Sequence, residues 1–398
     1  MDRSYWRTVS FVTLWQVSAS VCYYTVFAAT PFFRDAFGLS RLSVGLVVTA
    51  LTLGYAVWLL PVGALIDRFG ERRTLVIGLV GLSAGAAMVA GAPTYALLLA
   101  ATFFLGSTYA TAIPGTNKAI YGNIAAGRQN LAMGIKQVGV TAGSGISALL
   151  VTGLASVLYW QAGFLIAASV GFVVAVVFAF FYRGTDSSGT AEYPDFRALS
   201  HNGPYRTLVA AGFFLGAALF TTTGYTVLYV HEAIGTSIAF GGVVLALVQL
   251  FGSAGRLIGG WLSDNLPGDP QNRIGAILIV QAAGGAALFV AVATTDSAWS
   301  AVVMFSALGF FVLGHTGVYY SYMATLVGTD EMGGATAGGQ LALVVGSIVA
   351  PPAFGYLADT VGYRGSWWLL AAGTGIASGL LAYSVRLEPQ INEPAMGE

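Results

Sequence analysis

Twelve long apolar runs restrict this 398-residue chain to one kind of environment. Each run holds about 18 to 26 residues, the length that an α-helix needs to cross a hydrocarbon core of roughly 30 Å. Charged residues make up only 9% of the chain, whereas soluble domains carry about 25%. We therefore expect an all-α membrane protein with twelve transmembrane helices at 7–33, 42–66, 74–92, 95–119, 130–156, 160–182, 205–230, 239–263, 273–293, 298–324, 333–358 and 365–386.

One long polar segment, residues 183–204, divides the chain and predicts a linker between two six-helix halves, 1–182 and 205–398. The implied repeat of about 200 residues suits two pseudo-symmetric transporter halves. The first run, which begins near Trp6, is too long for a signal-peptide core and should stay as a helix.

The placement of basic residues predicts the orientation, because Lys and Arg concentrate on the cytoplasmic side of a membrane. We expect an integral protein of the plasma (inner) membrane with both termini, the linker and a short C-terminal tail in the cytoplasm. That orientation places Arg3, Arg7, Arg68, Arg72, Arg73, Arg128, Arg183, Arg197, Arg206, Arg273 and Arg386 inside, against Arg34, Arg41 and Arg364 outside.

Glycine and proline predict how the helices pack and bend. Glycines cluster at 134–145 and 333–339, where they would let helix backbones approach closely in lipid. Pro114 and the pair Pro351–Pro352 each remove a backbone donor, so we expect them to bend the fourth and eleventh helices.

A densely charged turn, GALIDRFGERRT at 63–74, follows the second run. It resembles the G-x-x-x-D-R-x-G-x-R-R loop between helices 2 and 3 of the major facilitator superfamily of secondary transporters. A weaker copy, with Asn265 in place of the first arginine, appears in GRLIGGWLSDN. The resemblance implies a cytoplasmic gate, in which the aspartate caps a neighbouring helix and pairs with an arginine; a positive-inside anchor is the alternative. The gate residues would be Gly63, Asp67, Arg68, Gly70, Arg72, Arg73 and Asp264.

Other segments extend this resemblance over nearly the whole chain. Residues 114–143 and 354–367 are similar to the helix 4–5 segment and the helix 11–12 turn of a widespread bacterial and archaeal branch. The segment around Arg256 resembles helix 8 of oxalate/formate exchangers and monocarboxylate transporters, whose arginine binds the substrate carboxylate. The exchangers' helix 11 lysine is missing, and Gln340 is the large polar group of that helix. Pairing with Asp264 in the gate is the alternative role for Arg256.

Polar residues within the apolar runs are costly in lipid and tend to face a cavity or a partner. Lys136 is followed by a polar stripe at Gln137, Thr141 and Ser144, and His315 is the deep group that titrates near neutral pH. The histidine is a proton site, a substrate donor, or a side chain satisfied by a neighbouring hydroxyl. The candidate substrate contacts are Arg256, Lys136, Gln137, His315, Tyr23, Gln16, Tyr109 and Gln340.

The charge pattern favours an anionic substrate. Asp and Glu fall in loops or at helix ends, so a cavity lined by Arg256 and Lys136 would hold cations without anions. We expect a secondary active or facilitative transporter of a small organic anion, a carboxylate, in which two halves rock about a central site. Protons or a counter-substrate are its possible coupling partners. The alternatives are a proton-coupled exporter of hydrophobic compounds and a receptor that binds a ligand without transport.

Several other functions lack their sequence signals. The G-x-S-x-G match at 81–85 lies inside an apolar run, and no G-x-x-x-x-G-K-[ST] loop occurs, so neither an enzyme nor ATP-driven transport is expected. The net charge of zero gives no case for nucleic-acid binding. Cys22 is the only cysteine, which excludes a thiolate metal site. We expect a monomer without a cofactor.

Overall fold

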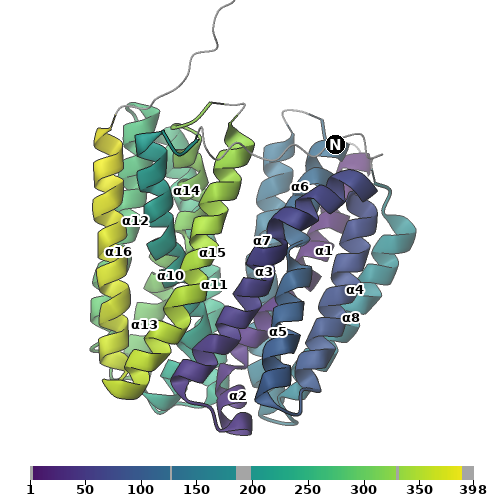
Figure 1. The fold of residues 1–398 in the computed structure, drawn as a ribbon, viewed down its shortest axis with the longest axis vertical. Coiled ribbons are helices and arrows are strands. Elements are labelled where there is room, and N and C mark those ends of the chain that lie inside the picture. Colours follow the sequence, from purple (N-terminus) through teal and green to yellow (C-terminus); the bar gives the residue numbers. More distant parts are fainter. Residues whose placement is uncertain (1–2, 126–127, 185–198, 329–330, 388–398) are drawn as a thin grey trace, which may run out of the picture. The chain divides into compact units, whose positions relative to one another are not determined.

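The computed structural model describes residues 3–125, 128–184, 199–328 and 331–387, and these residues are helical without any strand (Figure 1). The first helices are α1 (Arg3–Ala28), α2 (Thr30–Phe37), α3 (Arg41–Phe69), α4 (Glu71–Ala90), α5 (Tyr95–Tyr109), α6 (Ala112–Asn123), α7 (Gln129–Ala155) and α8 (Gln161–Phe181). The later ones are α10 (Gly203–Glu232), α11 (Ile238–Asn265), α12 (Pro270–Val292), α13 (Ala298–Leu308), the π-helical turn η1 (Gly309–Leu313), α14 (His315–Met323), α15 (Met332–Thr360) and α16 (Tyr363–Arg386). Twelve helical stretches of the described chain are long and apolar enough to cross a membrane, which confirms the predicted fold class.

The chain divides into two compact units. Unit 1 is Met1–Ala191 with Thr223–Leu250, and unit 2 is Glu192–Thr222 with Phe251–Glu398. The last turns of α10 therefore belong with the first six spans, and two hydrogen bonds show why: Thr30 Oγ1 donates to Gly224 O at 3.0 Å, and Tyr225 Oη donates to Arg41 O at 2.7 Å. The six-helix halves expected on either side of the linker stay a prediction.

Three spans depart from a single regular helix. The first breaks at Ala29, and Pro31 lies at the start of α2. The fourth breaks between α5 and α6, and the predicted effect of Pro114 explains the place, since a proline ring clashes with the carbonyl four residues earlier, here that of Ala110. The tenth contains η1, which the sequence analysis did not foresee. By contrast, Pro351 and Pro352 lie inside the continuous helix α15.

Glycine is required where the helix backbones meet. In unit 1, a Cβ added to Gly54 of α3 would lie 2.0 Å from Phe103 O, and one added to Gly106 of α5 would lie 1.8 Å from Leu51 O. In unit 2, a Cβ on Gly346 of α15 would lie 1.9 Å from Phe213 O of α10. No side chain fits at such distances. These small residues therefore set the helix spacing, as expected for packing in lipid.

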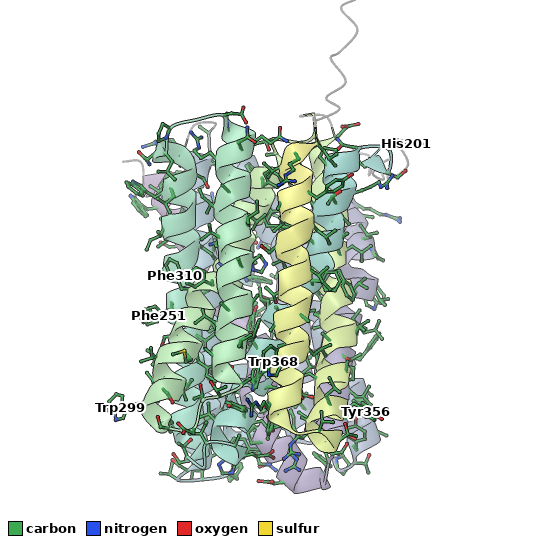
Figure 2. The ribbon with its side chains drawn as sticks, turned by 90° about the vertical axis from the view of Figure 1, so that its left-hand side faces the viewer. His201, Phe251, Trp299, Phe310, Tyr356 and Trp368 are labelled. Atoms are coloured by element: carbon green, nitrogen blue, oxygen red, sulfur yellow. The ribbon has the colours of Figure 1, made fainter. Side chains whose placement is uncertain are left out.

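One face of unit 2 is apolar and rich in aromatic side chains (Figure 2). Trp299 is 82% exposed, Tyr356 56% and Trp368 48%. Large exposed apolar side chains are unfavourable in water, but they suit contact with lipid and its interface. This surface supports the placement of the chain as an integral, multi-pass membrane protein.

Candidate functional site

A polar cluster in unit 2 contains three of the predicted substrate contacts. Arg256 lies on α11, His315 begins α14, and Gln340 lies on α15, where its Oε1 accepts a short hydrogen bond from Tyr320 Oη. Arg256 Nε donates to Leu313 O at 3.1 Å. The charge of Arg256 acts on both His315 and Tyr320, so these groups share one electrostatic environment.

The contact between α11 and the π-helical turn positions this cluster. A Cβ added to Gly255 would lie 2.1 Å from Phe310 O and 3.0 Å from Gly314 Cα. Arg256 follows the first of these glycines, and His315 follows the second. Close backbone contact therefore holds the guanidinium and the imidazole in neighbouring places.

His315 is buried, with 1% of its surface exposed, and the group that acts on its imidazole through a hydrogen bond is the backbone of Val312, not a side chain. Tyr319 and Tyr322 follow His315 at helical spacing of four and seven residues, and both bond elsewhere: Tyr319 Oη donates to Gly339 O at 3.5 Å, and Tyr322 Oη donates to Ser384 Oγ at 3.2 Å. These two tyrosines therefore give the imidazole no hydroxyl partner.

A second polar cluster lies in unit 1 and joins residues predicted from helix 1 to the fourth span. Gln16 Nε2 donates to Ser20 Oγ at 3.3 Å, and Ser20 Oγ lies 3.3 Å from Tyr109 Oη. Thr116 Oγ1 donates to Gln16 Oε1 at 3.4 Å. The ring of Tyr23 stacks on that of Tyr109, with 4.0 Å between centroids. All five side chains are buried, so the predicted contacts form one small network.

Lys136 is the unusual group of unit 1. Only 2% of its surface is exposed, and its Nζ donates to Asn117 Oδ1 at 2.7 Å. An ammonium has three donors, and the described residues provide no carboxylate for it. Burying an unpaired charge is costly, so this position favours an incoming anion.

The polar stripe predicted after Lys136 is only partly assembled. Thr141 and Ser144 are buried, and Ser144 Oγ has no hydrogen-bond partner among the described residues. Gln137 is exposed. The structure therefore places Gln137 apart from the buried residues with which the spacing grouped it.

The predicted gate loop is described except for the side chain of Asp67, which lies outside the described part, so the predicted cap stays a prediction. Gly70 has a φ of 82° and ends α3 as α4 begins, a conformation that side chains other than glycine rarely adopt. Gly63 has open space around it. The three arginines have different surroundings. Arg68 Cζ lies 5.2 Å from the ring centroid of Phe69, Arg72 donates to Ala179 O, and Arg73 is exposed.

The second copy of the loop shows no gate contact. Asp264 is exposed near the end of α11, and the described residues give it no ion pair. Its gate role therefore stays a prediction.

Two buried or half-buried carboxylates were missed by the sequence analysis. Glu71 begins α4, is fully buried, and accepts from Tyr182 Oη at 3.5 Å. Burial, together with the Glu71 charge, raises the pKa of Tyr182 well above its ordinary value. Glu232, at the end of α10, forms ion pairs with Arg34 and, at 2.9 Å, with Arg41. In the sequence these groups appear only as isolated charges beside the ends of four predicted helices.

No group of three His, Cys, Asp or Glu side chains within the described ranges could hold a metal ion.

Comparison with known proteins agrees with this architecture. A sequence profile of the Major Facilitator Superfamily matches residues 12–342. A probable sulfoacetate transporter of Cupriavidus necator is 25% identical over 358 residues, which cover 84% of this chain and 83% of that protein. The hexuronate transporter of Bacillus subtilis is 23% identical over 386 residues, which cover 92% and 91%.

A solved structure is similar over nearly the full length. It is a bacterial homolog of the human lysosomal transporter Spinster, in an inward-facing and unoccupied conformation, with a TM-score of 0.83 and 15% identity. The similarity covers 97% of this chain and 98% of that one. At this identity the likeness establishes the fold.

Proposed function

Because the chain belongs to the Major Facilitator Superfamily, and is therefore a transporter and not an enzyme, we propose that it carries a small organic anion, a carboxylate, by alternating access. Arg256 is the proposed carboxylate ligand, in keeping with its resemblance to the helix 8 arginine of oxalate/formate exchangers and monocarboxylate transporters. The protein is proposed to act as a monomer in the plasma membrane, with both termini in the cytoplasm.

The observation that carries the proposal is the burial of Lys136 without a carboxylate. Its hydrogen bond goes to the neutral amide of Asn117. A cation in such surroundings attracts an anion, because the anion replaces part of the hydration that burial removed.

The relatives support the same substrate class. The names of the two transporters compared above specify sulfoacetate and hexuronate, which are both small carboxylate anions. The identities of 25% and 23% support the class and not a particular compound.

Uptake into proteoliposomes tests this function. We expect at least one carboxylate of a labelled panel to accumulate above protein-free vesicles, and Arg256→Gln to remove that uptake. Arg206→Gln is the matched control, because Arg206 is exposed at the start of α10. Transport of a hydrophobic cation with no response to any anion would contradict the proposal in favour of the exporter, and binding without counterflow would favour the receptor.

His315 supports a further proposal about coupling. Its imidazole is buried near the charge of Arg256, and neither Tyr319 nor Tyr322 bonds to it. We propose that it either carries the coupling proton or donates to the substrate. If His315→Gln loses uptake driven by a pH gradient but keeps counterflow, His315 carries the coupling proton. If the variant loses both activities, His315 donates to the substrate.

A further inference from the structure

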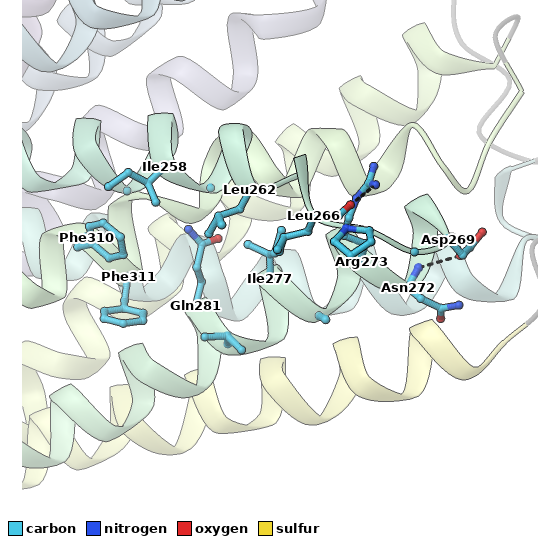
Figure 3. A pocket seen from close by; sticks show the side chains of 16 residues that line it. Ile258, Leu262, Leu266, Asp269, Asn272, Arg273, Ile277, Gln281, Phe310 and Phe311 are labelled. Atoms are coloured by element: carbon cyan, nitrogen blue, oxygen red, sulfur yellow. Dashed lines mark hydrogen bonds between the residues drawn. The ribbon is translucent and has the colours of Figure 1, made fainter. Parts of the chain in front are cut away.

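Two apolar grooves of the same construction lie in the two units, and the polar side chains of the two clusters are not among their lining residues. The groove in unit 2 has a volume of about 650 Å³ and lies between α11, α12 and η1 (Figure 3). The groove in unit 1 has a volume of about 610 Å³ and lies between α3, α4 and α5. These helices are the second, third and fourth spans of each predicted half. The repeat therefore builds the groove twice.

The groove of unit 2 has largely apolar walls and one charged end. Ile258, Leu262 and Ile277 lie along it, and Phe310 and Phe311 lie at its inner end (Figure 3). Ile258 is 45% exposed, which in a membrane-spanning helix means contact with lipid chains. This wall is suited to hydrocarbon.

The length of the groove matches one leaflet of a bilayer. Arg273 and Gln281 lie at its two ends on α12, eight residues apart, which corresponds to about 12 Å of helix rise. Half of a hydrocarbon core of roughly 30 Å is about 15 Å. One acyl chain therefore fits beside α12 when its headgroup lies at the level of Arg273.

The polar end offers an arginine with free donors. Arg273 Nη1 donates to Leu266 O at 2.6 Å, and its Nε is buried without a partner among the described residues. A guanidinium has five donors and binds phosphate through paired hydrogen bonds. Asp269 lies at the same end, but its carboxylate is exposed and accepts from Asn272 N at 3.0 Å, as the cap of α12.

The groove of unit 1 also has an arginine at one end, but the described residues that line it include no aspartate. Arg73 is exposed near the start of α4, and it is the one charged side chain among the described residues that line this groove. Trp58, Leu65 and Ile77 form part of its apolar wall. An arginine at the polar end of an apolar groove is thus the feature that the two grooves share.

We propose that these grooves bind anionic phospholipid. In unit 2, one acyl chain lies along α11 and α12 toward Phe310 and Phe311, and the phosphate accepts hydrogen bonds from Arg273. In unit 1, the phosphate of a second lipid accepts from Arg73. The exposed apolar walls supply affinity for any phospholipid chain, and the arginines supply the preference for negative charge.

Native mass spectrometry of the purified full chain tests the proposal, with phosphatidylglycerol and phosphatidylcholine of the same acyl chains as probes. We expect wild-type protein to retain up to two phosphatidylglycerol molecules more tightly than phosphatidylcholine. Arg273→Gln should weaken one phosphatidylglycerol site on the order of tenfold, through loss of a charge-assisted contact. Arg73→Gln should weaken the other site, and Arg206→Gln should change neither.

A second variant separates the contribution of the apolar groove from that of the arginine charge. Ala276 is exposed and lines the groove of unit 2, so Ala276→Trp should fill the groove and weaken both lipids at that site without disturbing the helix core. Equal retention of the two lipids by wild type, or equal effects of Arg273→Gln and Arg206→Gln, would overturn the proposal. The proposal would also be overturned if the protein were a dimer that retains no lipid and if Ala276→Trp dissociated that dimer. The groove would then be a protein interface. None of these measurements depends on transport.

Discussion

Replacing Glu232 by glutamine should loosen the end of unit 1 where α10 packs on the first helices. Its carboxylate accepts from Arg34 and Arg41, and Thr30 donates to Gly224 O close by. The amide keeps the size of the side chain and removes its charge. The ion pairs should therefore be lost while the apolar packing stays.

The size of the effect follows from the burial of the three side chains. A hydrogen bond to a charged group contributes about 1.5–3 kcal/mol when shielded from water. The side chains of Arg34, Arg41 and Glu232 are 30%, 25% and 14% exposed, so solvent screening reduces each pair to about 1 kcal/mol. Loss of both pairs, about 2 kcal/mol, should raise the population of the open form about thirtyfold.

Cysteine accessibility measures this population. Cys22 is the sole cysteine and is buried, so Cys22→Ser provides a background in which Thr30→Cys is the only thiol. Thr30 is fully buried, and a membrane-impermeant maleimide should label the new thiol only when this end opens. Glu232→Gln should raise the labelling rate about thirtyfold if the closed form dominates in wild type.

Asp35 provides the matched control, because it is an exposed acid on α2 near the same end. Asp35→Asn should leave the labelling rate within about twofold of the parent, as expected for an exposed charge. If Glu232→Gln changes the rate no more than Asp35→Asn does, the ion pairs do not hold this end closed, and the reasoning is refuted.

Two pairs of glycine substitutions test the helix packing at Gly255 and the backbone conformation at Gly70. Gly255→Val should lower the melting temperature by several degrees, or prevent folding, because its Cβ would lie 2.1 Å from Phe310 O and overpacking costs about 1–3 kcal/mol; Gly260→Val, in open space, should have little effect in the same thermal assay. Gly70→Ala should destabilise by about 1–2 kcal/mol, because Gly70 has a φ of 82°, whereas Gly63→Ala should be nearly neutral; equal melting temperatures for the two alanine variants would contradict this explanation.

The sequence predicted the helices well because their main determinant is local. A run of apolar residues must span the bilayer, and the break before Pro114 follows from a steric clash within one turn. The π-helical turn at 309–313 was not predictable in this way. Its carbonyls face α11, at the contact of Gly255 with Phe310 O, so it depends on tertiary packing.

The candidate sites show the same division between local and distant information. Gln16 and Ser20 are four residues apart on one helix, a local spacing, and a hydrogen bond joins them in the structure. Spacing also grouped Gln137 with Thr141, yet Gln137 is exposed and Thr141 is buried. Helical phase identifies one face of a helix, but it does not say which part of that face another helix covers.

The ion pairs of Glu232 could not be predicted from spacing. Its partners Arg34 and Arg41 lie 198 and 191 residues earlier in the chain. A single sequence contains no record of such long-range pairing, so the three residues appeared only as charges near the ends of predicted helices. Only the folded structure brings these three side chains together.

Binding of a transported carboxylate to the purified protein tests the central claim most directly. Isothermal titration should show that Arg256→Gln weakens binding on the order of tenfold or more, since a charge-assisted contact is lost. Lys136→Gln should also weaken it, and both variants should keep melting temperatures near that of Arg206→Gln. Unchanged carboxylate affinity in a folded Arg256→Gln protein would contradict the account.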